Sequence, residues 1–161
     1  MRTQRLEASD YVRKNSQKVF EICSLVDHIQ HEDHSQVLQV LDIVARDLAL
    51  LSPRKELEIM GLIERVKEHI RFERTQLFPI IRDWAVRGAL TDKQTLNVRR
   101  ALHSKFVYGW GHILEEFQEI QEGISHERVL KNLEMLGEEL YWYVKVENTV
   151  LFPVLTKQLP E

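Results

Sequence analysis

A short phrase occurs twice in the chain, and each copy places a glutamate six residues before the proline of an identical Leu-Phe-Pro. The copies occupy residues 73–79 and 147–153, an offset of 74 residues (73 to 147). A histidine also lies upstream of each copy. The two histidines are His34 and His103, which are offset by 69 residues (34 to 103). A repeat of this length predicts two equivalent units related by a pseudo-twofold axis.

Residues that interrupt helices are scarce, with four prolines and six glycines among 161 residues. Neither an Asn-Gly nor an Asp-Gly pair occurs, and no sustained alternation of apolar and polar residues favours strands. Signals for helix ends are present instead: an N-cap before a proline, a capping box, a stopping glycine and a serine that can cap the next helix. In that order they are Ser52 with Pro53, Thr91 with Gln94, Gly123, and Ser125.

These signals predict an all-α fold. Because the connections are short, successive helices are expected to pack antiparallel, as an up-down four-helix bundle over residues 25–161. Residues 1–24 are predicted to form an N-terminal helical extension, which either packs on the bundle or mediates a homodimer. Whether the first stretch is one helix or two stays open. The predicted stretches are about 10–50, 53–86, 91–122 and 125–157.

Composition excludes several classes of protein. The formal net charge is −3, from 22 basic and 25 acidic residues, and no basic block indicates nucleic-acid binding. No apolar run approaches the roughly 18 residues of a membrane helix. The single cysteine, Cys23, excludes an internal disulfide framework and favours a reducing, cytoplasmic location.

Polar groups of the ligand type fall on predicted core faces. Residues four apart on a helix differ by about 40°, so His69 shares a face with Glu73, and Tyr143 shares a face with Glu147. The apolar neighbours on these two faces are Ile63, Val66 and Leu77, and Leu136, Leu140 and Leu151. The first helix is expected to bury His34, Leu38, Leu41, Ala45 and Leu48, and the third to bury Leu96, His103, Phe106, Trp110 and Phe117.

Buried carboxylates and imidazoles require compensation, because an unpaired buried charge costs several kcal/mol. Two metal ions would provide it, since facing helices build dinuclear iron or manganese sites from such side chains. A single histidine on an apolar face is more often an ordinary core residue, so the prediction rests on the whole constellation. A metal-free helical scaffold is the alternative.

Three segments resemble the hemerythrin-like (HHE cation-binding) family, and most closely its di-iron proteins that repair iron centres. They are residues 26–34, 68–79 and 146–153, and the resemblance covers about residues 25–155. It implies two iron ions, or manganese, with an oxo or hydroxo bridge. It also implies histidine ligands at His34, His69 and His103, bridging carboxylates at Glu73 and Glu147, and a further ligand at Tyr143.

Tyr143 stands where the family has a fourth histidine. If its phenolate binds iron, the negative charge should stabilise the ferric state and give the protein a charge-transfer colour. Alternatively, Tyr143 fills space beside a site of five residues. His31, Trp110 and Phe106 are predicted to surround the ligands, with His31 as an alternative ligand. His112, half a turn from His103, is predicted to be exposed or to cap the helix.

The resemblance implies a function in oxidative or nitrosative stress, through reaction with peroxide, O2 or NO or through repair of iron centres. The alternative is a non-enzymatic module that binds or senses O2 or NO. Whether the protein is an enzyme stays open, as does a redox partner. The expected ligand is a diatomic molecule or peroxide.

Overall fold

The computed structural model describes residues 19–87, 90–104, 110–151 and 153. This part of the chain is all-helical and contains no strand. The segments are α2 (Val19–His28), η1 (Ile29–Asp33), α3 (His34–Arg46), η2 (Leu48–Leu50), α4 (Pro53–Phe72), η3 (Glu73–Leu77), α5 (Phe78–Arg87), α6 (Asp92–Ser104), α7 (Trp110–Glu122), α8 (Glu127–Val146) and η4 (Glu147–Leu151).

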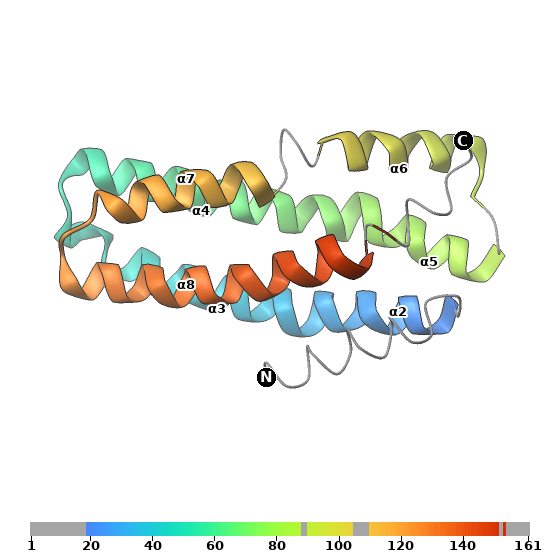
Figure 1. Ribbon diagram of the computed structural model, residues 1–161, viewed down its shortest axis with the longest axis horizontal. Helices are drawn as coiled ribbons and strands as arrows, with labels where there is room; N and C mark the ends of the chain where they lie inside the picture. The colour runs from blue at the N-terminus through green and yellow to red at the C-terminus, as the bar shows by residue number, and fades with distance from the viewer. Residues whose placement is uncertain (1–18, 88–89, 105–109, 152, 154–161) are drawn as a thin grey trace.

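The long helices lie side by side along the long axis of the molecule (Figure 1). Helix α3 packs against α4 and α8, and α7 packs against the same two helices. Helix α2 packs on α5, and a hydrogen bond from Gln94 to Asp83 links α6 to α5. The first stretch is one continuous helix from residue 19 to residue 46, so the open question between one helix and two is settled for this range. The predicted helical residues before 19 and after 153 lie outside the described residues.

Three of the predicted helix ends are confirmed. Helix α4 begins at Pro53 after an extended Ser52, with φ −61° and ψ 151°. The capping box before α6 is present, because Thr91 N–H donates to the Gln94 side chain at 3.0 Å and Gln94 N–H donates to the Thr91 hydroxyl at 3.2 Å. Helix α7 ends one residue before Gly123.

The prediction for the start of α8 is wrong, because His126 and not Ser125 is its N-cap residue. His126 has an extended backbone, with φ −68° and ψ 115°, and its side chain makes no capping hydrogen bond. A serine one position earlier is therefore too far from the first helical N–H groups to take the capping position.

The core faces of α4 and α8 agree with the prediction, since all five residues of each predicted line are buried. The line on α3 is partly wrong. Leu38 is half-buried and Ala45 is exposed, whereas Val37 and Val44 are buried. Buried residues on a helix can be spaced four and then three apart, or three and then four apart, and both spacings fit the helical period. Only the position of the neighbouring helices selects between them.

A further residue predicted to be in the core, Leu96, is exposed, and so is the aromatic Tyr141. Leu96 in α6 is 48% exposed and Tyr141 in α8 is 56% exposed. Tyr141 lies outside the buried row that runs from Leu140 to Tyr143, and its ring instead contacts the neighbouring Trp142. An aromatic side chain at the edge of a helix face can remain at the surface in this way.

Three short π-helical turns interrupt the α-helices, at η1, η3 and η4. In two of them the closing hydrogen bond spans five residues, from His34 N–H to the Ile29 carbonyl and from Phe78 N–H to the Glu73 carbonyl. Such turns are uncommon and occur frequently at functional sites. Here they lie where the predicted ligands lie, because η1 ends one residue before His34 and the other two begin at Glu73 and Glu147.

The two copies of the repeated phrase have the same backbone conformation. The N–H of Glu73 is shared between the carbonyls of His69 and Ile70. The N–H of Glu147 is shared in the same way between the carbonyls of Tyr143 and Val144. The repeat in the sequence is therefore also a repeat of helix geometry, and it places both glutamates at the first residue of a π-helical turn.

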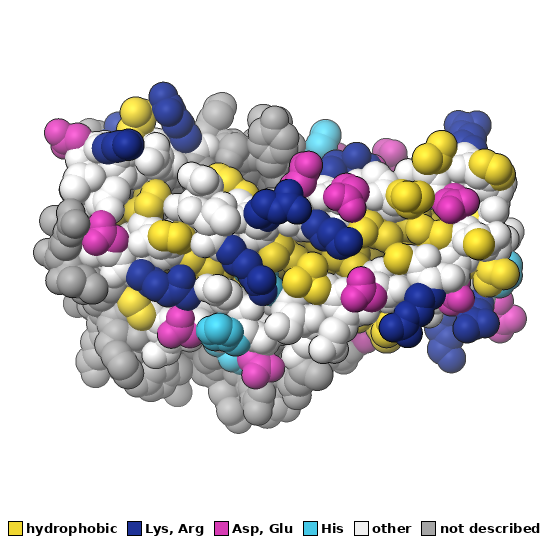
Figure 2. Space-filling model, turned by 180° about the vertical axis from the view of Figure 1, so that it is seen from behind, with side chains coloured by type: hydrophobic (Ala, Val, Ile, Leu, Met, Phe, Trp, Pro, Cys, Tyr) yellow, Lys and Arg dark blue, Asp and Glu magenta, His cyan; other side chains and the backbone are white. Residues whose placement is uncertain are grey.

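The described surface is mixed in character. Figure 2 shows one face on which basic and acidic side chains alternate, with hydrophobic side chains visible between them. Among the described helices, none combines the length and the apolar character needed to cross a membrane.

Phe117 of α7 packs closely against Gly137 of α8, where an added Cβ would lie 2.9 Å from Cε1 of Phe117. Overpacking of this kind costs about 1–3 kcal/mol. We therefore expect Gly137→Ala to lower the free energy of unfolding by about that amount, measured by urea denaturation. Gly111 in α7 is the matched control, because a Cβ there meets nothing within 4 Å. Gly111→Ala should leave the free energy unchanged or raise it by about 0.4–1 kcal/mol; equal losses in both variants would contradict the close approach.

Candidate metal centre

Three side chains of the ligand type meet in the interior, from three different segments. His69 lies in the last turn of α4, and Glu73 and Glu147 begin η3 and η4. One ligand atom from each lies within 4.8 Å of the others. His69 Nε2 is 3.1 Å from Glu73 Oε1 and 3.7 Å from Glu147 Oε2. The side chains are 7%, 1% and 0% exposed, so water does not solvate the carboxylates.

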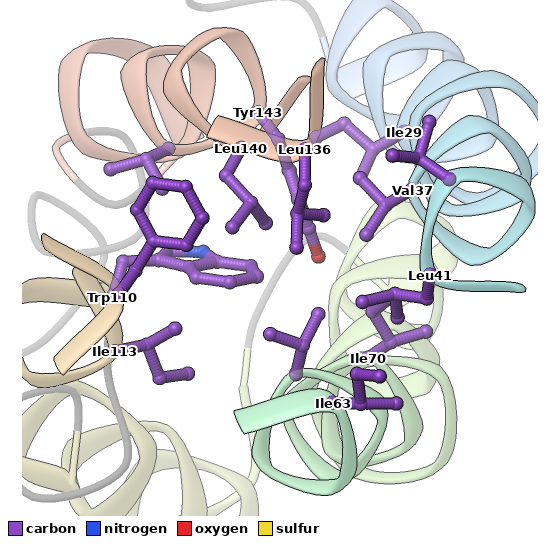
Figure 3. Close-up of a cluster of buried hydrophobic side chains, with 14 of the residues drawn as sticks. Ile29, Val37, Leu41, Ile63, Ile70, Trp110, Ile113, Leu136, Leu140 and Tyr143 are labelled. Carbon is purple, nitrogen blue, oxygen red and sulfur yellow. The ribbon is translucent and has the colours of Figure 1, made fainter. Parts of the chain in front are cut away.

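An aromatic side chain holds one oxygen of each carboxylate. The Tyr143 hydroxyl donates to Glu73 Oε1, and the Trp110 indole N–H donates to Glu147 Oε2 at 2.6 Å. Figure 3 shows that Tyr143 and Trp110 enter the interior from different helices. The second oxygens, Glu73 Oε2 and Glu147 Oε1, are buried and have no hydrogen-bond partner among the described residues. Buried polar atoms without a partner are rare, and here each of the two carboxylates that meet His69 has one such oxygen.

Proximity couples the protonation of the three groups. Burial and the neighbouring Glu73 carboxylate raise the pKa of Glu147 to about 8. Burial acts to raise the pKa of Glu73 as well, but the neighbouring Glu147 and His69 side chains lower it below its ordinary value. Burial acts against the charged form of His69, but the two carboxylates raise its pKa well above the ordinary value. At neutral pH the cluster is therefore an imidazolium, a carboxylate and a carboxylic acid, with no net charge. A divalent cation would replace the two protons without changing that charge.

His34 adjoins the cluster through Tyr143 and does not belong to the group of three. Its Nε2 lies 2.5 Å from the Tyr143 hydroxyl oxygen and 3.6 Å from Glu73 Oε1. Its ring is fully buried and stacks on Phe78, with 5.6 Å between ring centroids. Burial lowers the pKa of His34 to about 3, and the neighbouring Arg74 lowers it too. The imidazole is therefore neutral.

Trp110 contacts His69, Glu147 and Tyr143. Its ring centroid lies 4.2 Å from that of His69 and 4.7 Å from that of Tyr143. It is 2% exposed, so it fills the interior on the α7 side. The phenol of Tyr143 is likewise buried, and burial together with Glu147 and Glu73 raises its pKa well above 10.

The structure does not describe the side chains of two predicted residues, and it places two other histidines at the surface. His103 lies in the last turns of α6, and its side chain is outside the described part. Phe106 is outside the described residues altogether. His31 is exposed in η1, and His112 is exposed in α7, as predicted.

Arg74 is a neighbour of the site that the sequence did not indicate. Its Nε donates to His34 Nδ1 at 3.0 Å, and its Nη2 donates to the Gln30 carbonyl in η1 at 3.1 Å. An arginine beside a glutamate on a helix is usually exposed, so its residue type carries no signal. Its inward direction follows from its place in the π-helical turn that begins at Glu73, and nothing in the residue sequence marks that turn.

Comparison of the chain with protein-family models, with curated proteins and with solved structures finds no match in any of the three. The interpretation of this site as a metal centre therefore rests on its own side chains. One imidazole and two carboxylates, buried and converging, are a ligand set that can hold a metal ion.

Proposed function

We propose that the chain is a hemerythrin-like metal protein whose His69, Glu73 and Glu147 side chains bind iron or manganese. The observation that carries this proposal is the convergence of two buried carboxylates and one imidazole, in which Glu73 Oε2 and Glu147 Oε1 have no hydrogen-bond partner among the described residues. Mixed nitrogen and oxygen donors of this kind suit iron and manganese better than they suit soft, thiolate-seeking ions.

The proposed architecture is the four-helix bundle of that family. Each of α3, α4, α7 and α8 packs against two others of the four, which supports a closed arrangement around the cluster. The repeated phrase contributes one carboxylate from each half of the chain. We infer that the repeat persists because the site needs two equivalent glutamates, each at the first residue of a π-helical turn.

The proposed ligand is a small molecule, namely peroxide, O2 or NO, and the proposed role is protection against oxidative or nitrosative stress or the repair of iron centres. A bound iron or manganese ion would supply redox chemistry and an open coordination position for such a molecule. The protein would contribute a dry interior. Tyr143 and Trp110 place aromatic rings beside the cluster and fix the orientation of the carboxylates, and Phe78 stacks on the adjoining His34.

The number of ions is a separate proposal. Three protein ligands at one point account for one ion, and the second iron ion predicted from the sequence requires further donors. The sequence predicts His34, His103 and Tyr143 as these donors, but the hydrogen bond that His34 Nδ1 accepts from Arg74 disfavours His34. Metal analysis of the purified protein, combined with its concentration, gives the number directly. A content well below one iron or manganese ion per chain, after expression with both metals supplied, would contradict the proposed function.

Metal binding should also stabilise the protein. A ligand that binds the folded state alone contributes about 2.7 kcal/mol at a concentration 100 times its Kd. We therefore expect Mn²⁺ to raise the Tm of metal-free protein in a concentration-dependent way, and EDTA to reverse the rise. Differential scanning calorimetry measures both. His69→Gln should remove the effect, whereas the exposed His112→Gln should keep it; equal shifts in the two variants would place the bound ion elsewhere.

Peroxide added to the metal-loaded protein distinguishes a catalyst from a binding module. Sustained release of O2 over many equivalents supports an enzyme. A stoichiometric spectral change that reverses when the ligand is removed supports binding or sensing. Either result retains the metal centre, and the two assign different functions to it.

A further inference from the structure

Arg74 determines which ring nitrogen of His34 carries a proton. The guanidinium of arginine has donors and no acceptor. Its Nε lies 3.0 Å from His34 Nδ1, so that nitrogen must present a lone pair. A protonated imidazolium has donors on both nitrogens and could not form this contact. His34 is therefore a neutral imidazole with its single proton on Nε2.

The proton on Nε2 sets the direction of the bonds that follow. His34 Nε2 lies 2.5 Å from the Tyr143 hydroxyl oxygen and donates to it. The Tyr143 hydroxyl in turn donates to Glu73 Oε1. The chain of hydrogen bonds thus runs in one direction, from Arg74 through His34 and Tyr143 to Glu73. It occupies Glu73 Oε1 and leaves Oε2 for a cation.

A metal-bound histidine usually has the opposite arrangement. Its lone pair points at the metal, and its other ring nitrogen donates a proton to a carbonyl or a carboxylate. In His34 the nitrogen that faces the cluster carries the proton, and the outer nitrogen accepts. The inner nitrogen of His34 is therefore unsuited to bind a cation while Arg74 stays in place.

We propose that Arg74 is a positioning residue that fixes His34 in its Nε2-protonated form, so that His34 orients Tyr143 and Glu73 and does not itself bind the metal. The part of this inference that concerns the metal rests on the proposed function. The part that concerns the tautomer does not, because it follows from the hydrogen bonds among Arg74, His34 and Tyr143.

Nitrogen-15 NMR of histidine-labelled, metal-free protein tests the tautomer directly. The signals of His34 are assigned by their loss in His34→Gln. We expect them to show a protonated Nε2 and an unprotonated Nδ1. A His34 ring protonated on Nδ1, or on both nitrogens, would overturn the proposal. This measurement does not depend on metal binding.

Zn²⁺ then serves as a diamagnetic probe of the centre in the same experiment. We expect the ring signals of His69 to shift strongly on saturation, while His34 keeps its proton on Nε2. Loss of that proton with a ligand-type shift would show that His34 binds the ion, and would overturn the proposal. If no signal of His69 responds to Zn²⁺, Mn²⁺ or Fe²⁺, the proposed function fails, while the metal-free spectrum still decides the role of Arg74.

Substitution of Arg74 tests whether Arg74 causes His34 to prefer the Nε2-protonated tautomer. Arg74→Met should remove this preference, so that His34 populates both neutral tautomers or becomes protonated. Arg74→Lys, which keeps a donor that can reach the ring, should restore part of the preference. Arg71→Met is the matched control, because Arg71 is exposed one turn earlier on the same helical rod. An unchanged His34 tautomer in Arg74→Met would overturn the assignment, and the wild-type spectrum keeps the proposal testable if that variant does not fold.

Discussion

Glu147→Gln is expected to weaken binding of Mn²⁺ or Fe²⁺ by about 100-fold or more, on the order of 3 kcal/mol, without destabilising the metal-free protein. The glutamine keeps the shape and the acceptor that Trp110 binds, but it cannot supply a negative charge to a cation. Because the raised pKa of Glu147, about 8, already favours the neutral acid at pH 7, its replacement by a neutral amide removes no charge from the metal-free interior.

Isothermal titration with Mn²⁺ and urea denaturation measure the two effects separately. Glu134→Gln is the matched control, since Glu134 is an exposed glutamate on the same helix. It should change neither quantity. If Glu147→Gln bound Mn²⁺ within about threefold of wild type, roughly 0.7 kcal/mol, Glu147 would not be a ligand.

Tyr143→Phe is expected to lower the free energy of unfolding of the metal-free protein by about 2 kcal/mol or more. The hydroxyl accepts from His34 and donates to Glu73, so its removal leaves two buried polar groups without that partner. A buried polar group that loses its partner costs about 1–3 kcal/mol. Urea denaturation at neutral pH, with EDTA present, measures the loss.

Tyr141→Phe provides the control, because Tyr141 lies on the same helix and is 56% exposed. It keeps the ring that contacts Trp142, and it should change the free energy by less than about 0.5 kcal/mol. A loss in Tyr143→Phe no larger than that in Tyr141→Phe would contradict the hydrogen bonds through the Tyr143 hydroxyl.

The same variant decides between two roles of Tyr143. The sequence led to the hypothesis that its phenolate binds iron, whereas its raised pKa and its hydrogen bond to Glu73 indicate a neutral donor. A visible band of the ferric protein that disappears in Tyr143→Phe supports direct ligation. A spectrum that keeps the same bands supports the role of hydrogen-bond donor.

The parts of the fold that sequence reasoning predicted well are those with a repeated or local signal. The core lines of α4 and α8 were predicted correctly because each contains a copy of the same phrase. Two copies define the buried helix face better than one does. The capping box at Thr91 is likewise local chemistry that needs no knowledge of the neighbouring helices. The convergence of His69, Glu73 and Glu147 followed from the repeat and the helical period together.

The parts that could not be predicted depend on tertiary structure. The buried face of α3 was misplaced because Leu38 and Val37 fit the helical period equally well, and the packing against α4 and α8 selects Val37. The π-helical turns have no marker in the sequence. They direct Arg74 toward His34, and so the role of Arg74 became visible only in three dimensions.

Anomalous diffraction at the iron or manganese edge, from crystals of metal-loaded protein, tests the metal centre most directly. We expect an anomalous peak in the interior between His69, Glu73 and Glu147, with carboxylate and imidazole atoms at bonding distance. The number of peaks gives the number of ions, and the ligands of each show whether Tyr143 or His34 takes part. Crystals that contain stoichiometric metal but show their peaks only at the surface would contradict the proposed centre.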